Sequence, residues 1–201
     1  MLFYAITGLI NALASTFLGL FVFFKNRKAK VNQTFALFCL SVAVWSYAYY
    51  FWPSAQDQAS ALFWFRVLHI GAIFIPICYL HFVLIWLNLY RNKKRVLKLG
   101  YLAAFILCAF SFTPLFIKDV APKFSLKYWG EPGILYHFFL FIFFIYAIYA
   151  VYLLFKHYQQ SSGIKRSQIK YILAGTIIGY LGGATNYPLW YNIPFYPIGN
   201  W

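Results

Sequence analysis

Acidic residues are nearly absent from this sequence. Its 201 residues include three Asp or Glu against 17 Lys or Arg, and charged residues make up only 10% of the chain. Soluble domains carry about a quarter of their residues as charged groups, so this composition excludes an ordinary soluble fold. The three acids, Asp57, Asp119 and Glu131, also lie too far apart in the sequence to indicate a carboxylate pair for general acid-base catalysis.

Other reactive groups are scarce as well. Cys39, Cys78 and Cys108 lie in separate apolar runs without a C-x-x-C spacing, so they indicate neither a disulfide framework nor a zinc site. The sequence shows no nucleophile beside a base and no phosphate-binding glycine loop. His69 and His81 would stand about 18 Å apart along one helix and cannot share a metal ion. We therefore expect no enzyme activity, cofactor or metal in this chain.

Long apolar runs dominate what is present, because 63% of the residues are hydrophobic and 24% are aromatic. Six runs approach or exceed the length that a helix needs to cross a bilayer. The sequence therefore predicts an all-α fold, a polytopic membrane bundle of six transmembrane helices that forms one domain over residues 1–201. The predicted helices cover about residues 2–24, 35–51, 61–89, 99–117, 134–155 and 171–187.

The basic residues are clustered between these runs. Thirteen of the 17 fall within residues 25–30, 91–98 and 156–170, whereas all three acids fall in the alternate loops. Basic loops of membrane proteins stay on the cytoplasmic side, so these clusters indicate topology rather than nucleic-acid binding. We expect the amino terminus and Trp201 to lie outside.

Glycine recurs every fourth residue in the last run, at Gly175, Gly179 and Gly183. This G-x-x-x-G spacing is typical of membrane helices that approach a neighbour closely. We therefore predict a buried packing face there, and expect Gly179→Leu to disrupt assembly more than Phe141→Leu.

An aromatic, proline-rich segment follows the glycine run and contains Asn186, Tyr187 and Trp190. Such residues gather at the membrane interface, and the outer end of the third run would bring Arg66 and His69 to the same level. A cation, an imidazole and aromatic rings at one membrane level predict a ligand-binding mouth.

Two basic groups of the third run allow more than one interpretation. His81 falls near the middle of the membrane, five residues after Pro76, where ionisable groups tend to face a bundle interior. It either contributes to a binding site or is a neutral imidazole bonded across helices. Arg66 either binds a ligand or extends its guanidinium to the interface.

The order of these features resembles a known family. The matching segments are N-Q-T-F-A-L-F from Asn32, W-S-Y from Trp45, A-L-F-W-F-R-V-L from Ala61 with Pro76 and H-F after it, K-R-S-Q-I-K from Lys165, and N-Y-P-L-W-Y-N-I-P-F-Y-P-I-G-N from Asn186. Together they resemble the amino-terminal seven-helix sensory region of bacterial and archaeal histidine kinases, which also heads some diguanylate cyclases. The similarity spans nearly the whole chain, although no seventh helix, phosphoacceptor helix or ATP-binding domain follows.

The resemblance implies a sensory input module in the cytoplasmic membrane of a prokaryote. Its expected partners are the bilayer, a small-molecule or lipid-derived ligand, and a second copy joined through an output domain. A seventh helix beginning near Tyr196 or Pro197 would carry the signal inward, so we expect the chain to be the front of a longer protein. Two alternatives stay open: a six-helix substrate-binding subunit of a transporter, and a bundle with only a scaffold role.

Overall fold

The structure is a computed structural model that describes residues 2–195 and 197–200. The predicted start of a seventh helix at Tyr196, and the predicted outer position of Trp201, lie outside these residues. The long helices are α1 (Leu2–Lys25), α2 (Lys30–Phe51), α3 (Gln58–Trp86), α4 (Tyr90–Phe110), α5 (Ile134–Gln160) and α6 (Gly163–Ala184). The shorter elements are η1 (Trp52–Ser54), β1 (Ile117–Lys123), β2 (Leu126–Pro132), α7 (Tyr187–Trp190) and η2 (Ile198–Asn200).

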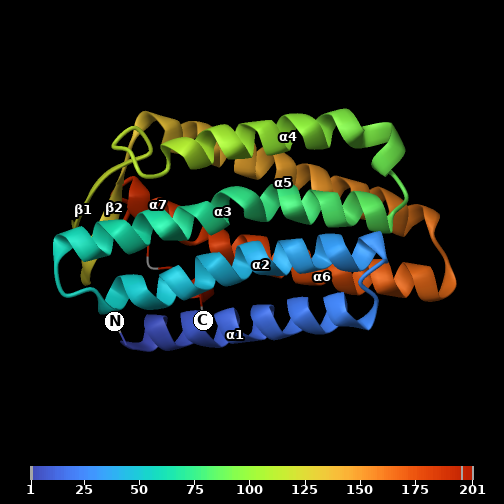
Figure 1. The fold of residues 1–201 in the computed structure, drawn as a ribbon, viewed down its shortest axis with the longest axis horizontal. Helices are drawn as coiled ribbons and strands as arrows, with labels where there is room; N and C mark the ends of the chain where they lie inside the picture. The colour runs from blue at the N-terminus through green and yellow to red at the C-terminus, as the bar shows by residue number, and fades with distance from the viewer. Residues whose placement is uncertain (1, 196, 201) are drawn as a thin grey trace.

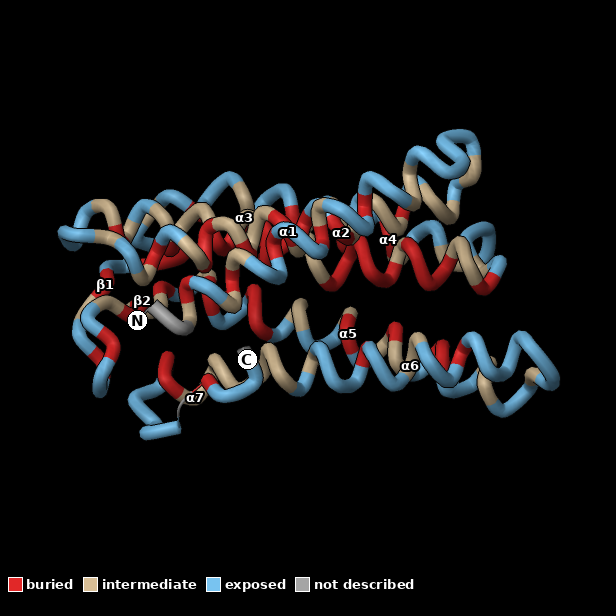
Figure 2. Tube along the Cα trace, turned by 90° about the horizontal axis from the view of Figure 1, so that it is seen from below, coloured by how far each residue is buried: buried red, intermediate tan, exposed pale blue. Residues whose placement is uncertain are grey.

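The long helices lie side by side as a bundle, with the hairpin β1–β2 and α7 at one end (Figure 1). α3 occupies the centre, where it packs against α2, α4 and α5, and most of its residues are buried. α6 packs chiefly against α5 and the segment 198–200. Seen from below, α6 and α7 lie apart from α1 to α4 (Figure 2). The bundle therefore has a tightly packed centre and one helix at its margin.

The helices begin earlier than the apolar runs predicted, because they continue into the basic flanks. α4 begins at Tyr90 and α6 at Gly163, and both carry bases in their first turns. Lys and Arg are good helix formers, so a helix does not stop where its apolar stretch stops. α4 also ends at Phe110 rather than at residue 117, because Thr113 precedes a proline and lies in a turn.

Local capping sets both ends of the central helix. Asp57 accepts hydrogen bonds from the backbone N–H and the hydroxyl of Ser60, both at 2.8 Å, and these bonds hold the pKa of Asp57 below its ordinary value. At the other end Asn88 takes a left-handed conformation with φ of 59°, and the Leu89 N–H donates to the carbonyl of Leu84 at 2.7 Å. This is the arrangement that commonly ends a helix when glycine or asparagine follows it.

The segment between the fourth and fifth predicted helices contains an antiparallel hairpin. β1 pairs with β2, and Lys123 forms a 2.9 Å ion pair with Glu131 across the two strands. The side chain of Trp129 on β2 is 2% exposed and packs against Trp52 and Trp190. The hairpin thus covers one end of the bundle and contributes an aromatic ring to its interior.

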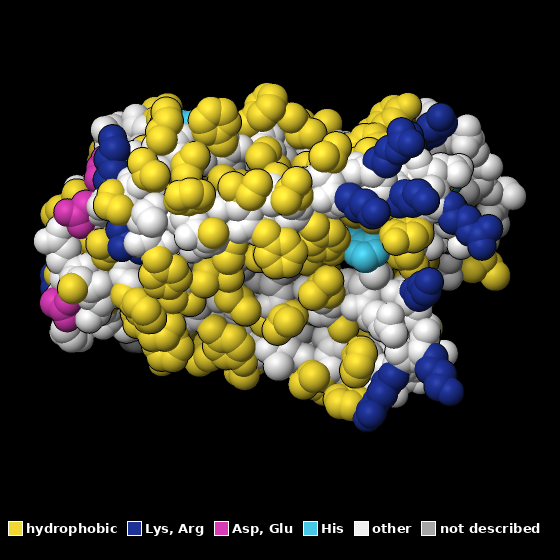
Figure 3. Space-filling model, turned by 45° about the horizontal axis from the view of Figure 1, so that its top comes forward, with side chains coloured by type: hydrophobic (Ala, Val, Ile, Leu, Met, Phe, Trp, Pro, Cys, Tyr) yellow, Lys and Arg dark blue, Asp and Glu magenta, His cyan; other side chains and the backbone are white. Residues whose placement is uncertain are grey.

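Four segments are long and apolar enough to be candidate membrane spans: Tyr4–Lys25, Lys30–Ser54, Gln58–Trp86 and Ile134–Gln160. Figure 3 shows the apolar surface that such spans require, with most Lys and Arg at one end and the acids at the other. This separation of charge is typical of a protein that crosses a bilayer. The chain is therefore a mostly helical membrane protein.

A close backbone contact at a glycine joins α2 and α3. A Cβ placed on Gly71 would lie 2.6 Å from the carbonyl oxygen of Ser41 and 2.8 Å from the Cα of Trp45. Both are backbone atoms that cannot rotate away, so only glycine fits at this position. Gly71 fixes how closely the two helices approach.

The predicted packing face of α6 has no close neighbour among the described residues. A Cβ on Gly175, Gly179 or Gly183 would meet no atom within 4 Å among the described residues. These glycines border a cavity instead, because side chains of α2 and α3 keep the backbone of α6 at a distance. Gly182, which was not predicted, makes the close approach, since a Cβ there would lie 2.8 Å from the carbonyl oxygen of Gly199.

Two alanine substitutions should have opposite effects. Gly71→Ala forces a methyl group against the backbone of α2, so it should lower the free energy of unfolding by about 1–3 kcal/mol. Gly179→Ala adds a methyl group to open space and improves helix propensity, so it should leave stability unchanged or raise it by about 0.5–1 kcal/mol. Thermal unfolding in detergent measures the change in stability of both variants. Phe141→Leu, a substitution on the exposed surface, is the control. Equal losses at the two glycines would contradict this account of the helix contacts.

Candidate functional site

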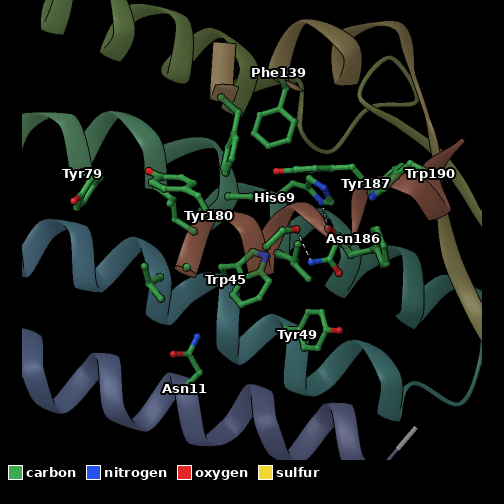
Figure 4. Close-up of a pocket in the computed structure, with 18 of the residues that line it drawn as sticks. Asn11, Trp45, Tyr49, His69, Tyr79, Phe139, Tyr180, Asn186, Tyr187 and Trp190 are labelled. Atoms are coloured by element: carbon green, nitrogen blue, oxygen red, sulfur yellow. Dashed lines mark hydrogen bonds between the residues drawn. The ribbon is translucent and has the colours of Figure 1, made fainter. Parts of the chain in front are cut away.

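A cavity of about 320 Å³ lies between α6 and the packed centre of the bundle. Residues of α1, α2, α3, α5, α6, α7 and β2 line it, and Figure 4 shows His69 at its centre. Most of the lining is aromatic. The aromatic lining residues are Phe38, Trp45, Tyr49, Trp52, Phe65, Tyr79, Trp129, Tyr136, Phe139, Phe143, Tyr180, Tyr187 and Trp190.

An aromatic cluster closes the end of the cavity next to the hairpin. The ring of Trp190 stacks on that of Tyr136 with 3.9 Å between centroids, and His69 meets Trp190 edge-on at 5.3 Å. Phe65 packs against Trp129 at 5.7 Å. Helix α7 and strand β2, which are distant in the sequence, therefore meet α3 and α5 at this end.

His69 is buried and its ring orientation is fixed. Its Nδ1 lies 2.7 Å from the carbonyl oxygen of Phe65, one turn earlier on α3. A carbonyl oxygen can only accept, so Nδ1 carries the proton and donates. In the neutral imidazole Nε2 is then a hydrogen-bond acceptor, and His69 presents that acceptor among aromatic rings.

Three polar atoms of the lining are buried without a hydrogen-bond partner among the described residues. They are Nε1 of Trp129 and the hydroxyl groups of Tyr136 and Tyr180. A donor buried without an acceptor costs about 1–3 kcal/mol, so proteins seldom leave several together. All three atoms belong to side chains that line this one cavity.

The opposite end of the cavity contains the polar connection between α3 and α6. The hydroxyl groups of Tyr79 and Thr176 are hydrogen-bonded to each other, and Thr176 also donates to the carbonyl of Ile172 at 2.6 Å. Tyr79 packs against Tyr180 with 5.9 Å between ring centroids. α6 is therefore tied to the centre of the bundle at this level, below the aromatic cluster.

The structure brings together four of the six residues predicted as candidates for ligand binding. His69, Asn186, Tyr187 and Trp190 all line the cavity. Asn186 donates to the carbonyl of Gly183 at 2.9 Å, which holds its amide at the end of α6. Their shared position follows from the turn between α6 and α7. Ligand binding by these residues stays a prediction.

Arg66 and His81 do not line the cavity. Arg66 donates to the carbonyl of Ile117 at 3.0 Å and so anchors the start of the hairpin. His81 lies 2.9 Å from the hydroxyl group of Tyr101, which matches the interpretation of an imidazole bonded across helices. Both side chains therefore have structural contacts in this fold, away from the predicted mouth.

Sequence reasoning did not predict the lining residues contributed by α5 and the hairpin. In the sequence Trp129 lies between two predicted helices, and Tyr136 is one of many aromatic residues in its run. The hydropathy pattern contains no signal for them, because interior and lipid-facing positions of a membrane helix are equally apolar. Only the packing of α5 and β2 onto α3 distinguishes Trp129 and Tyr136 from aromatic residues that face the lipid.

Comparison with known proteins identifies the family. No curated protein and no solved structure matches the chain. The sequence profile of the N-terminal 7TM region of histidine kinase matches residues 8–199, which is nearly the whole chain. The helical bundle, its apolar surface and its cavity are consistent with a sensory region that spans a membrane. The chain belongs to the family of N-terminal 7TM regions of histidine kinases.

Proposed function

We propose that this chain is a membrane-embedded sensory input module that responds to a small molecule in its cavity. Occupancy changes the packing of α6 against α2 and α3, and this change reaches a cytoplasmic output domain. The observation that carries the proposal is the set of unpartnered polar atoms, Nε1 of Trp129 and the hydroxyl groups of Tyr136 and Tyr180, around one aromatic cavity. Nothing in the comparisons supports the transporter alternative.

α6 is the element most suited to move. Its contacts with α3 include the hydrogen bond between Tyr79 and Thr176 and, at its first turn, Lys165 lying 3.7 Å from the ring centroid of Trp86. Beyond Thr176 the cavity lies between α6 and the pair α2–α3, where Tyr180 still packs on Tyr79. A Cβ on Gly179 would meet no atom within 4 Å among the described residues. A ligand that binds one position of α6 better than another shifts the balance between them.

The charge distribution supports a topology for the module. We infer that all six long helices cross the cytoplasmic membrane of a prokaryote, with the basic end in the cytoplasm and the amino terminus outside. α4 and α6 then cross with apolar second halves after basic first turns. The aromatic end of the cavity lies toward the outer surface, and the first turn of α6 lies at the cytoplasmic face.

Filling the cavity by mutation should shift α6. Gly179→Leu inserts a side chain where a ligand would lie, so the distance between spin labels at Leu40 on α2 and Ile178 on α6, both on the exposed surface, should change by about 1–2 Å. Electron paramagnetic resonance measures this distance. Leu181→Phe, which adds bulk on the exposed side of the same helix, is the matched control. Identical distances in both variants and the parent protein would contradict coupling between cavity and helix.

Accessibility to a thiol reagent tests the topology. Gln56→Cys and Lys28→Cys both place a thiol at an exposed position, at opposite ends of the bundle. A reagent that cannot cross membranes should label Gln56→Cys in intact cells and Lys28→Cys only after lysis. The reverse pattern would mean that the basic end faces outward.

A further inference from the structure

We propose that the ligand of this cavity is a neutral, lipid-soluble compound whose apolar body carries a hydrogen-bond acceptor such as a carbonyl oxygen. This inference rests on the proposed sensing role and narrows its ligand to one chemical class. Four features of the cavity carry it: the charge of its lining, the unpartnered polar atoms buried in that lining, the spacing of those atoms, and its access from the bilayer.

The lining requires a neutral ligand, because none of the described residues that border the cavity has a formal charge apart from the titratable His69. The nearby cations are engaged elsewhere. Arg66 donates to the carbonyl of Ile117, and Lys123 pairs with Glu131. An ionic ligand would be buried without a counter-charge, which is strongly unfavourable in an apolar site.

The polar atoms of the lining require an acceptor. Nε1 of Trp129 is a donor only, and it is buried without a partner among the described residues. Tyr136 is fully buried, and its hydroxyl group likewise has no partner there. The indole of Trp129 and the ring of Tyr136 both pack on Trp190, so the two donors serve one region of the cavity. A carbonyl oxygen has two lone pairs and can accept from either donor.

A second donor position lies deeper, with an apolar stretch between the two. The hydroxyl group of Tyr180 is also unpartnered, and its ring packs on Phe143 with 5.6 Å between centroids. Phe143 follows Tyr136 by seven residues on α5, a rise of about 10 Å. Phe139 lies between them and borders the cavity. This spacing fits a molecule with an apolar ring system that presents its acceptor at one end.

Access from the bilayer explains why the ligand would be lipid-soluble. Gly175 and Gly179 border the cavity, remain exposed and have no side chain to close the side of α6. The helix surface around them is apolar, with Ile178 72% and Leu181 66% exposed. A molecule dissolved in the hydrocarbon of the bilayer can therefore enter the cavity past Gly175 and Gly179, where α6 has no side chain to block it.

A matched pair of probes tests the class. 9-Fluorenone and fluorene share one flat, neutral ring skeleton, and only fluorenone has a carbonyl group. Binding of each to the protein in lipid nanodiscs is measured by equilibrium dialysis, with the Gly179→Leu protein, whose cavity is filled, giving the background from partition into lipid. We expect fluorenone to bind at least about fivefold more tightly than fluorene, the ratio that one net hydrogen bond provides. Fluorene-9-carboxylate, the charged analogue, should not bind above background.

Removing a donor should remove this preference. Tyr136→Phe and Tyr180→Phe each delete one hydroxyl group and keep the ring. At least one of them should lower the affinity for fluorenone about fivefold and leave that for fluorene unchanged. Neither hydroxyl group has a partner among the described residues, so neither variant should melt at a lower temperature than the parent protein without ligand. A lower melting temperature in both would show that the hydroxyl groups are already satisfied and would overturn the inference.

The outcomes separate this inference from the proposed function. Equal affinity for fluorenone and fluorene above background would overturn the acceptor class and leave the sensing cavity in place. Tighter binding of fluorene-9-carboxylate than of fluorenone would overturn the neutral class. No binding of any probe above background would also overturn the inference, whereas the proposed function would fail only if the spin-label distances did not respond to Gly179→Leu.

Discussion

The contact between α2 and α3 at Gly71 is the constraint on which the rest of this bundle depends. The two helix backbones meet there so closely that no side chain fits between them. In a membrane, lipid tails are as apolar as leucine, so helices associate through such close packing rather than through a hydrophobic effect. With α2 fixed on α3, their large side chains must extend toward α5 and α6. The cavity is the space that remains among those side chains.

The cavity combines two properties that bear on sensing. Its wall toward α3 is rigid, because α3 is held by α2, α4 and α5 and capped at both ends. Its wall toward α6 has small residues, and α6 packs chiefly against α5 and residues 198–200 rather than against α2 or α3. A site between a fixed wall and a movable one can convert occupancy into a helix displacement, which is the kind of change that signalling helices transmit.

Polar groups without partners give this site its chemical character. In hydrocarbon a free donor has no water to bond with, so each unpartnered group in the lining favours any ligand atom that satisfies it. The hairpin is important here, because it inserts Trp129 over the cavity and is itself held by the bond from Arg66 to Ile117. The sequence-based prediction had Arg66 at the ligand. In the structure Arg66 positions the hairpin, whose Trp129 has a buried Nε1 donor without a partner among the described residues.

The sequence by itself determined the class of protein, the number of long helices and the separation of charge between the two ends. These follow from composition and from the lengths of apolar runs, which depend on local preferences and on the thickness of a bilayer. The sequence also predicted that His69, Asn186, Tyr187 and Trp190 are neighbours, because residues at the same membrane level of a small bundle lie close together. All four line the cavity.

Only the tertiary structure decided which glycine makes a close contact and which residues face the cavity. Gly71 and Gly179 look alike in the sequence, yet one meets backbone and the other meets open space. Tyr136 faces the interior and Phe141, five residues later, faces outward at 66% exposure, although both lie in one aromatic run. Inside and outside are equally apolar for a membrane helix, so hydropathy carries no information about its rotation. That rotation is set by contacts between segments far apart in the chain.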